Sequence, residues 1–207
     1  MKQRDLFALP ALPPGMQYQP DFISREEEAD LLAKITELPI NHAKYRQFTA
    51  KRRIINYGGS YDFSRRQLLP ADEIPEFLHP LRERVARWVG VPPSQFTHAL
   101  IAEYVTGTQL GWHRDVPNFE IVTGISLGNA TRMRLRPYPP PKGRSKETIS
   151  LTLEPRSAYI LRDNARWNWQ HSLPPTKSTR YSVTFRTRRA LLQASRGAAA
   201  PDPQERS

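Results

Sequence analysis

The sequence predicts one α+β domain that is mainly β, with helices first and an antiparallel double sheet after them. Two stretches between residues 24 and 93 have the periodicity of amphipathic helices. From residue 96 onward the chain changes to short β-branched or aromatic runs separated by Gly, Pro and Asn. Such a series of strands is typical of a jelly roll, the cupin-like double-stranded β-helix, and we expect the N-terminal helices to pack against it.

The first predicted helix lies in SREEEADLLAKITELP, residues 24–39. Ser24 can cap its N-terminus, and Glu27 three residues later completes a capping box. Pro39 ends the helix, because proline cannot continue it. Three apolar residues share one face: Leu31, Ile35 and Leu38.

The second predicted helix lies in IPEFLHPLRERVARWVGVPP, residues 74–93. Gly90 and Pro92 follow its last apolar residue, which is the usual signal for the end of a helix. The face that we expect to be buried consists of Phe77, Leu78, Leu81, Val85, Trp88 and Val89.

Six runs after residue 96 are predicted strands, each ended by turn residues. One domain is expected to span residues 16–189, because 207 residues suit a single core of ordinary size. Residues 1–15 have the character of a flexible arm, and residues 190–207 have the small, polar composition of a disordered tail. The predicted strands lie at 96–104, 121–128, 131–138, 148–154, 157–162 and 180–186.

The chain is strongly basic: 31 Lys and Arg against 20 Asp and Glu give a net charge of +11. Such an excess favours an anionic partner, most often nucleic acid, although a basic surface also serves solubility alone. There is no cysteine, which excludes disulfides and thiolate metal sites. No apolar run is long enough to cross a bilayer, and the N-terminus lacks the features of a signal peptide. We therefore expect a cytoplasmic monomer without membrane contact.

The stretch GWHRDVPNFE, residues 111–120, places His113 and Asp115 two residues apart, so that on a strand both point to one face. A mononuclear ferrous site needs two imidazoles and one carboxylate on one face, with three positions left open. His171, in WNWQHSLPP, is the natural third ligand from a later strand. The alternative is a surface strand with polar residues, because H-x-D alone recurs by chance. The histidines expected to be ordinary structural residues are His42, His79 and His98.

The run TRYSVTFR, residues 179–186, carries Arg180 and Arg186 six residues apart. An even spacing on a strand directs both guanidiniums to one side, which faces the barrel interior if the apolar residues between them pack outward. Two inward arginines need an anion, and a dicarboxylate could pair with both. The alternative is a pair of surface charges on an edge strand.

Together, H-x-D, a distal histidine and two arginines six residues apart, in this order, resemble the AlkB family of iron(II)- and 2-oxoglutarate-dependent dioxygenases. The likeness covers about residues 50–187 and extends to AEYVTGTQLGWHRD, GISLG and YGGSYDFS. It implies iron held by His113, Asp115 and His171, with 2-oxoglutarate and O2 as co-substrates.

The same resemblance implies three co-substrate contacts. Arg180 would pair with the distal carboxylate of 2-oxoglutarate. Arg186 would lie near the carboxylate that chelates iron, and Tyr104 would donate a hydrogen bond from its phenol.

The segment KRRIINYGGSYDFSRR, residues 51–66, resembles the nucleotide-recognition lid of the family's DNA-repair members, and we place the lid at about residues 50–70. Its aromatic residues could stack on bases while its arginines hold phosphates. For the aromatic residues, packing in the core is the alternative. The expected substrate contacts are Tyr57, Tyr61, Phe63, Arg65, Arg66 and Trp112, with Arg52 and Arg53 as further phosphate ligands.

The resemblance therefore implies an enzyme that oxidatively demethylates alkylated bases in DNA or RNA, a repair reaction that releases succinate, CO2 and formaldehyde. A methylated base must leave its stack to reach a buried iron, so a flipped or single-stranded substrate is expected. One alternative is a protein hydroxylase or demethylase of the same fold, and another is a nucleic-acid-binding module without catalysis. Three positions depart from the family pattern: Ala102 and Ser182 replace asparagines, and Pro117 replaces an acidic residue that touches the damaged base.

Overall fold

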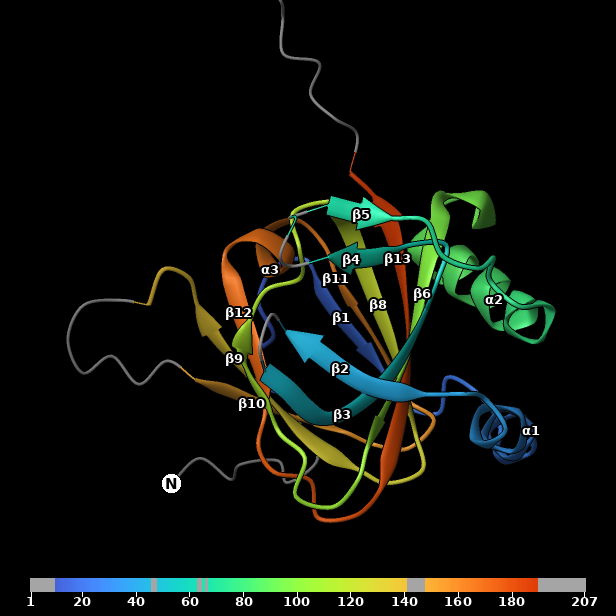
Figure 1. The fold of residues 1–207 in the computed structure, drawn as a ribbon. Coiled ribbons are helices and arrows are strands. Elements are labelled where there is room, and N and C mark those ends of the chain that lie inside the picture. Colours follow the sequence, from blue (N-terminus) through green and yellow to red (C-terminus); the bar gives the residue numbers. More distant parts are fainter. Residues whose placement is uncertain (1–9, 46–47, 63–64, 66, 141–147, 190–207) are drawn as a thin grey trace, which may run out of the picture.

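Two antiparallel sheets lie face to face and form a jelly roll (Figure 1). The computed structural model describes residues 10–45, 48–62, 65, 67–140 and 148–189. The larger sheet has seven strands in the order β1-β11-β8-β13-β6-β3-β2, and the smaller has four in the order β10-β9-β12-β7. A separate hairpin pairs β4 with β5. The predicted mainly β architecture is confirmed.

The strands of the larger sheet are Met16–Gln19 (β1), Asn41–Tyr45 (β2), Phe48–Tyr57 (β3), Phe96–Tyr104 (β6), Phe119–Leu127 (β8), Ala158–Leu161 (β11) and Arg180–Arg188 (β13). Those of the smaller sheet are Leu110–His113 (β7), Thr131–Pro137 (β9), Ile149–Leu153 (β10) and Trp169–Leu173 (β12). The hairpin strands are Ser60–Asp62 (β4) and Gln67–Leu69 (β5). The helices are Arg25–Thr36 (α1), His79–Val89 (α2) and Asp163–Trp167 (α3), with 3-10 turns at Glu76–Leu78 and Pro93–Gln95.

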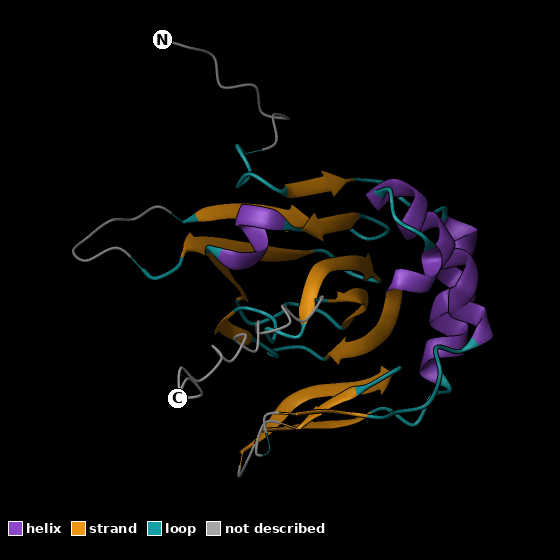
Figure 2. Cartoon of the chain, turned by 90° about the horizontal axis from the view of Figure 1, so that it is seen from above, coloured by secondary structure: helices purple, strands orange, loops and turns teal. Residues whose placement is uncertain are grey.

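The helices α1 and α2 lie on one side of the molecule and cover the outer face of the larger sheet (Figure 2). The predicted capping box of α1 is confirmed, because Ser24 Oγ accepts from the Glu27 N–H while the Glu27 carboxylate accepts from the Ser24 N–H. The second helix begins later than predicted, after the 3-10 turn, and ends at Gly90 with φ 84°. This left-handed conformation favours glycine and explains the stop.

The larger sheet packs against neighbouring elements on both faces, and each face contributes to its own core. Val183 and Phe185 of β13 are both 0% exposed and pack with the helices in the first core cluster. The opposite face packs against the smaller sheet, where Leu135 of β9 belongs to the second cluster. Since side chains alternate along a strand, Arg180 and Arg186 point between the two sheets.

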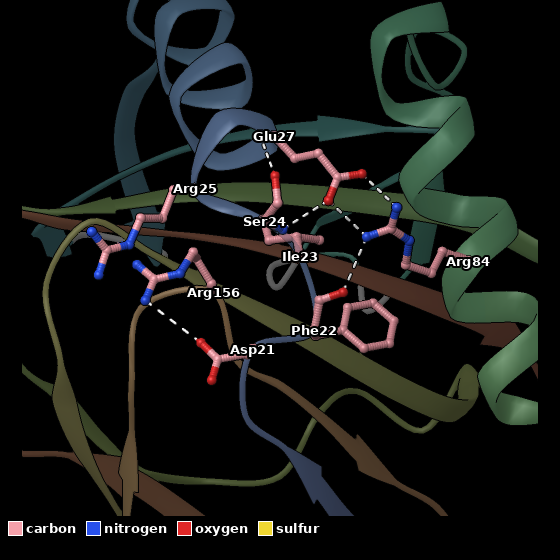
Figure 3. A pocket seen from close by; sticks show the side chains of 8 residues that line it. All are labelled: Asp21, Phe22, Ile23, Ser24, Arg25, Glu27, Arg84 and Arg156. Carbon is pink, nitrogen blue, oxygen red and sulfur yellow. Dashed lines mark hydrogen bonds and ion pairs between the residues drawn. The ribbon is translucent and has the colours of Figure 1, made fainter.

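A hollow beside the N-terminus of α1 is occupied by paired charges (Figure 3). The Arg84 guanidinium of α2 donates to the Glu27 carboxylate of α1 at 2.8 Å and to the Phe22 carbonyl at 3.1 Å. Arg156 and Asp21 lie 3.6 Å apart in the same hollow. These contacts tie α2 to α1 and to the segment that precedes α1, so the hollow has a structural role.

The first part of the predicted lid is instead a strand of the larger sheet. The strand β3 pairs with β2 and β6, and its β-branched and aromatic residues suit that position. It ends at Gly58, whose φ is 72° and where a Cβ would lie 1.9 Å from the Thr97 carbonyl oxygen. The hairpin β4-β5 follows. Residues 1–9 of the predicted arm and the whole predicted tail lie outside the described residues.

In the described part of the chain, no helix combines the length and the apolar character that spanning a bilayer requires.

Candidate metal centre and adjoining pocket

The three predicted metal ligands lie together on the inner side of the smaller sheet. His113 ends β7 and His171 lies on β12, and the two residues are direct register partners. Their ring centroids are 4.2 Å apart, and His171 Nε2 lies 3.9 Å from Asp115 Oδ1. One donor atom from each residue lies within 4.8 Å of the other two. Two imidazoles and one carboxylate so arranged fit a mononuclear Fe(II) site.

Hydrogen bonds hold these donors in position. His113 Nδ1 donates to the Gly111 carbonyl at 2.9 Å, which leaves Nε2 for a metal. Arg186 Nε donates to Asp115 Oδ2 at 2.6 Å, which leaves Oδ1 on the side of the second imidazole. Arg186 also donates to His98 Nδ1 at 3.3 Å. His98, predicted to be an ordinary strand residue, therefore helps to position Arg186.

Arg166 of α3 fixes the backbone that follows the first ligand. Its side chain is buried, and its Nη2 donates to the carbonyls of Asp115 at 3.2 Å, Val116 at 2.7 Å and Phe119 at 2.9 Å. Nothing in the local sequence predicts this contact, because α3 lies about 50 residues further along the chain.

Burial sets the protonation state of the three donors. It lowers the pKa of His171 to about 3 and also lowers the pKa of His113, so both imidazoles are neutral near pH 7. Burial alone would raise the pKa of the Asp115 carboxyl, but Arg186 and the two histidines hold that pKa well below its usual range. All three groups are therefore in the deprotonated form that metal binding requires.

A pocket between the two sheets adjoins these donors and contains both predicted arginines. Arg180 is 2% exposed, its Nη2 donates to Ser126 Oγ at 2.9 Å, and its guanidinium carbon lies 4.9 Å from the centroid of the Tyr104 ring. Burial lowers the pKa of Arg180, and none of the described carboxylates forms an ion pair with it. A buried guanidinium with only a neutral partner favours binding of an anion.

Two further residues line the pocket that were not predicted there. Arg52 of β3 is 8% exposed, and its Nη1 donates to the Tyr104 hydroxyl at 3.5 Å. It therefore faces the pocket, and its expected role at an external phosphate is corrected. Tyr159 of β11 reaches the pocket across Gly124, where a Cβ would lie 2.4 Å from its ring.

The two missing family asparagines fall side by side. Ala102 on β6 and Ser182 on β13 are register partners, so the two positions meet in the sheet that forms one wall of the pocket. Ile54 of β3 is the partner of Ala102 on its other side, and Arg52 lies two residues before it on the same face of that strand. Arg52 therefore lies on the pocket side of β3 beside this pair, where its Nη1 donates to the Tyr104 hydroxyl.

The predicted substrate contacts have different surroundings. Tyr57 is 6% exposed and belongs to the core cluster under the helices, so its ring has the packing role that was the alternative. Tyr61 is half-buried on β4, and Arg65 is exposed in the turn that follows, with its N–H donating to Asp62 at 3.1 Å. Outside the described residues are Phe63 and Arg66.

Trp112 and Arg53 are directed away from the pocket. Trp112 precedes His113 on β7, so its ring lies on the outer face of the smaller sheet, 4.4 Å from the guanidinium carbon of Arg136. Arg53 follows Arg52 on β3 and forms an ion pair with Glu103 on the opposite face. The Arg53 side chain is 43% exposed, so its expected role as a phosphate ligand stays a prediction.

A family model described as the 2OG-Fe(II) oxygenase superfamily matches residues 15–192. The chain belongs to this superfamily. It is a 2-oxoglutarate-dependent dioxygenase that uses Fe(II), 2-oxoglutarate and O2, and the grouping of two histidines and one aspartate fits iron.

Within the superfamily the chain is AlkB-like. It is 28% identical over 169 residues to the Probable RNA/DNA demethylase ALKBH6 of Danio rerio, an alignment that covers 78% of this chain and 70% of the relative. It is 28% identical over 187 residues to Uncharacterized protein L905 of Acanthamoeba polyphaga mimivirus, covering 80% and 81%. It is also 28% identical over 185 residues to the Alkylated DNA repair protein ALKBH8 homolog of Arabidopsis thaliana, covering 79% of this chain and 52% of that relative.

Two solved structures share the fold. The structure of OsALKBH1 superposes with a TM-score of 0.66 at 16% identity, covering 87% of this chain and 100% of that chain. A Pseudomonas putida prolyl-4-hydroxylase superposes with a TM-score of 0.59 at 14% identity, covering 84% and 93%. These likenesses confirm the jelly-roll architecture predicted from the sequence.

Proposed function

We propose that His113, Asp115 and His171 hold the ferrous ion and that Arg180 and Tyr104 bind 2-oxoglutarate in the adjoining pocket. The observation that carries this proposal is the position of a buried guanidinium, without a described counter-ion, in the same pocket as three deprotonated metal donors. A dicarboxylate can place one carboxylate at the metal and the other at this guanidinium, which grips it as a planar fork.

Bound iron would supply activation of O2, with the electrons coming from decarboxylation of 2-oxoglutarate to succinate and CO2. The chain's residues orient and shield this chemistry. Arg186 keeps the Asp115 carboxylate turned by its hydrogen bond to Oδ2, and Arg166 holds the backbone carbonyl of the same residue. The apolar wall formed by Met133, Leu153 and Leu173 excludes water from the co-substrate.

The substrate we propose is an N-methylated base in DNA or RNA, and the biological role we propose is repair of alkylation damage. Insertion of one oxygen atom of O2 into a methyl C–H bond gives a hydroxymethyl group on nitrogen. That group then loses formaldehyde, and the nitrogen keeps the hydroxyl proton. The names of the Danio rerio and Arabidopsis thaliana relatives and the net charge of +11 support this class of substrate.

The test is turnover with a panel of methylated DNA and RNA oligonucleotides and methylated peptides. Succinate and formaldehyde should form in equal amounts with at least one methylated oligonucleotide. His171→Ala should abolish both products, whereas the matched variant His42→Ala, which replaces an exposed histidine of β2, should leave both at the wild-type level. Coupled turnover with peptides alone would instead make the protein a protein hydroxylase or demethylase.

A further inference from the structure

The outer face of the smaller sheet carries arginines and aromatic rings without a carboxylate among them. On β9, Arg132, Arg134 and Arg136 alternate with Met133 and Leu135, which are buried between the sheets, so the three guanidiniums point outward. None of the residues in β7, β9, β10 and β12 is Asp or Glu. The helices α1 and α2 lie on the opposite side of the molecule (Figures 1 and 2).

Trp112 lies against two of these arginines. Its ring centroid is 5.2 Å from the guanidinium carbon of Arg134 and 4.4 Å from that of Arg136. The neighbouring strand β12 anchors both side chains, because Arg134 Nε donates to Ser172 Oγ at 3.1 Å and Arg136 Nε donates to Gln170 Oε1 at 2.9 Å. An arginine has five N–H donors, so both side chains keep donors for a ligand.

The same face continues past the ends of these strands. The guanidinium carbon of Arg114 lies 3.8 Å from the centroid of the Tyr138 ring, and Tyr138 is 39% exposed. Within the described residues, neither Arg114 nor any of the three arginines of β9 forms an ion pair. Cations without carboxylate partners, placed beside aromatic faces, are the combination that binds the phosphates and bases of a single strand.

We propose that this surface binds a single-stranded stretch of the nucleic acid that contains the substrate base. It is called the outer arginine face below and consists of Arg114, Arg132, Arg134, Arg136, Trp112 and Tyr138. This inference rests on the proposed nucleic-acid function, and it names a surface outside the pocket that contacts the same nucleic acid.

The layout of the strands connects this surface with the metal donors. Outward residues on one strand recur about every 7 Å along the backbone, so Arg132, Arg134 and Arg136 form a row along β9. One of the two edge strands of the smaller sheet is β7, and it carries Trp112 on its outer face and His113 on its inner face. A nucleic acid strand that crosses from β9 to β7 therefore arrives at the edge that bears a metal donor.

The experiment compares two triple variants that each remove three positive charges. Arg132→Gln/Arg134→Gln/Arg136→Gln removes them from the outer arginine face. Arg25→Gln/Lys34→Gln/Arg87→Gln removes them from exposed positions on α1 and α2. Dissociation constants for a long and a short methylated single-stranded oligonucleotide are measured over a series of salt concentrations, and thermal unfolding verifies that both variants fold.

For the face variant, the slope of log affinity against log salt should become less steep by about 2, and affinity at low salt should fall roughly tenfold to a hundredfold. The gain in affinity from the short to the long oligonucleotide should disappear as well. The helix variant should keep the wild-type slope and length dependence. A face variant that is folded and keeps the wild-type slope overturns the inference.

Variants of Trp112 distinguish a nucleic acid partner from other anionic partners. Trp112→Ala should weaken binding of the long oligonucleotide roughly tenfold to a hundredfold without a change in salt slope, and Trp112→Phe should restore most of it. If a polyglutamate peptide competes as well as the oligonucleotide and Trp112→Ala has no effect on binding, the partner of this face is an acidic protein and not a nucleic acid. A wild-type protein that binds no oligonucleotide contradicts the proposed function itself. If the wild-type protein demethylates an oligonucleotide but the face variant keeps the wild-type affinity and salt slope, only this inference is contradicted.

Discussion

Replacing Arg180 by methionine should have opposite effects on the ligand-free protein and on its complex with 2-oxoglutarate. The guanidinium is 2% exposed and donates to the neutral Ser126 Oγ, with no ion pair to a described carboxylate. A buried charge in this situation has an uncompensated desolvation cost of several kcal/mol, and methionine of similar length removes it. A gain of only about 1 kcal/mol in the free energy of unfolding would raise Tm by roughly 2–4 °C in a chain of this size.

With 2-oxoglutarate bound, Arg180→Met removes the forked partner of a buried carboxylate. That loss costs roughly 2–5 kcal/mol, so KM for 2-oxoglutarate should rise from about 30-fold to several thousandfold. Succinate release measures KM, and thermal unfolding with and without 2-oxoglutarate measures stability. Arg188→Met, at an exposed position of the same strand, is the matched control and should change neither. Wild-type KM in Arg180→Met, or a lower Tm of its ligand-free form, would refute the reasoning.

Three further predictions concern residues that support the fold and the metal centre. Arg166→Met should lower Mn(II) affinity about 10- to 100-fold in calorimetric titration, because the loop that carries Asp115 loses its buried hydrogen bonds. Unchanged affinity would show that the loop keeps its conformation without Arg166. Gly124→Ala should cost about 1–3 kcal/mol in urea unfolding, since the new Cβ lies 2.4 Å from the Tyr159 ring, and the cost should vanish in a Tyr159→Ala background. Ser24→Ala should cost about 0.5–2 kcal/mol in urea unfolding through loss of the helix cap while leaving KM for 2-oxoglutarate unchanged; a shifted KM would link the cap to the site.

Elements whose signals lie in neighbouring residues could be predicted from the sequence. The strand β6 has the predicted ends, Phe96 and Tyr104, and α1 has the predicted cap at Ser24. The sequence does not predict strand β3, because three consecutive basic residues, 51–53, obscure its alternation and favour a lid instead. Only the pairing of β3 with β6 determines that Arg52 turns inward, and that pairing joins segments about 50 residues apart.

The same distinction holds for the candidate site. His113 and Asp115 are two residues apart and Arg180 and Arg186 six, so the period of a strand predicts each pair on one face. His171 was predicted from the chemistry of the donor set, and the register with His113 brings the two together. Tyr159 and Arg166 belong to no local motif. The pairing of β11 with β8 brings Tyr159 to the pocket, and the placement of α3 brings Arg166 to the loop that carries Asp115.

The most direct test of the proposed metal centre is the iron content of the protein after anaerobic reconstitution with Fe(II) and dialysis. Wild-type protein and His42→Ala should each retain one iron per chain. His113→Ala, Asp115→Ala and His171→Ala should each retain close to none while remaining folded by circular dichroism. One iron per chain in all three of these variants would contradict the assignment of the metal centre.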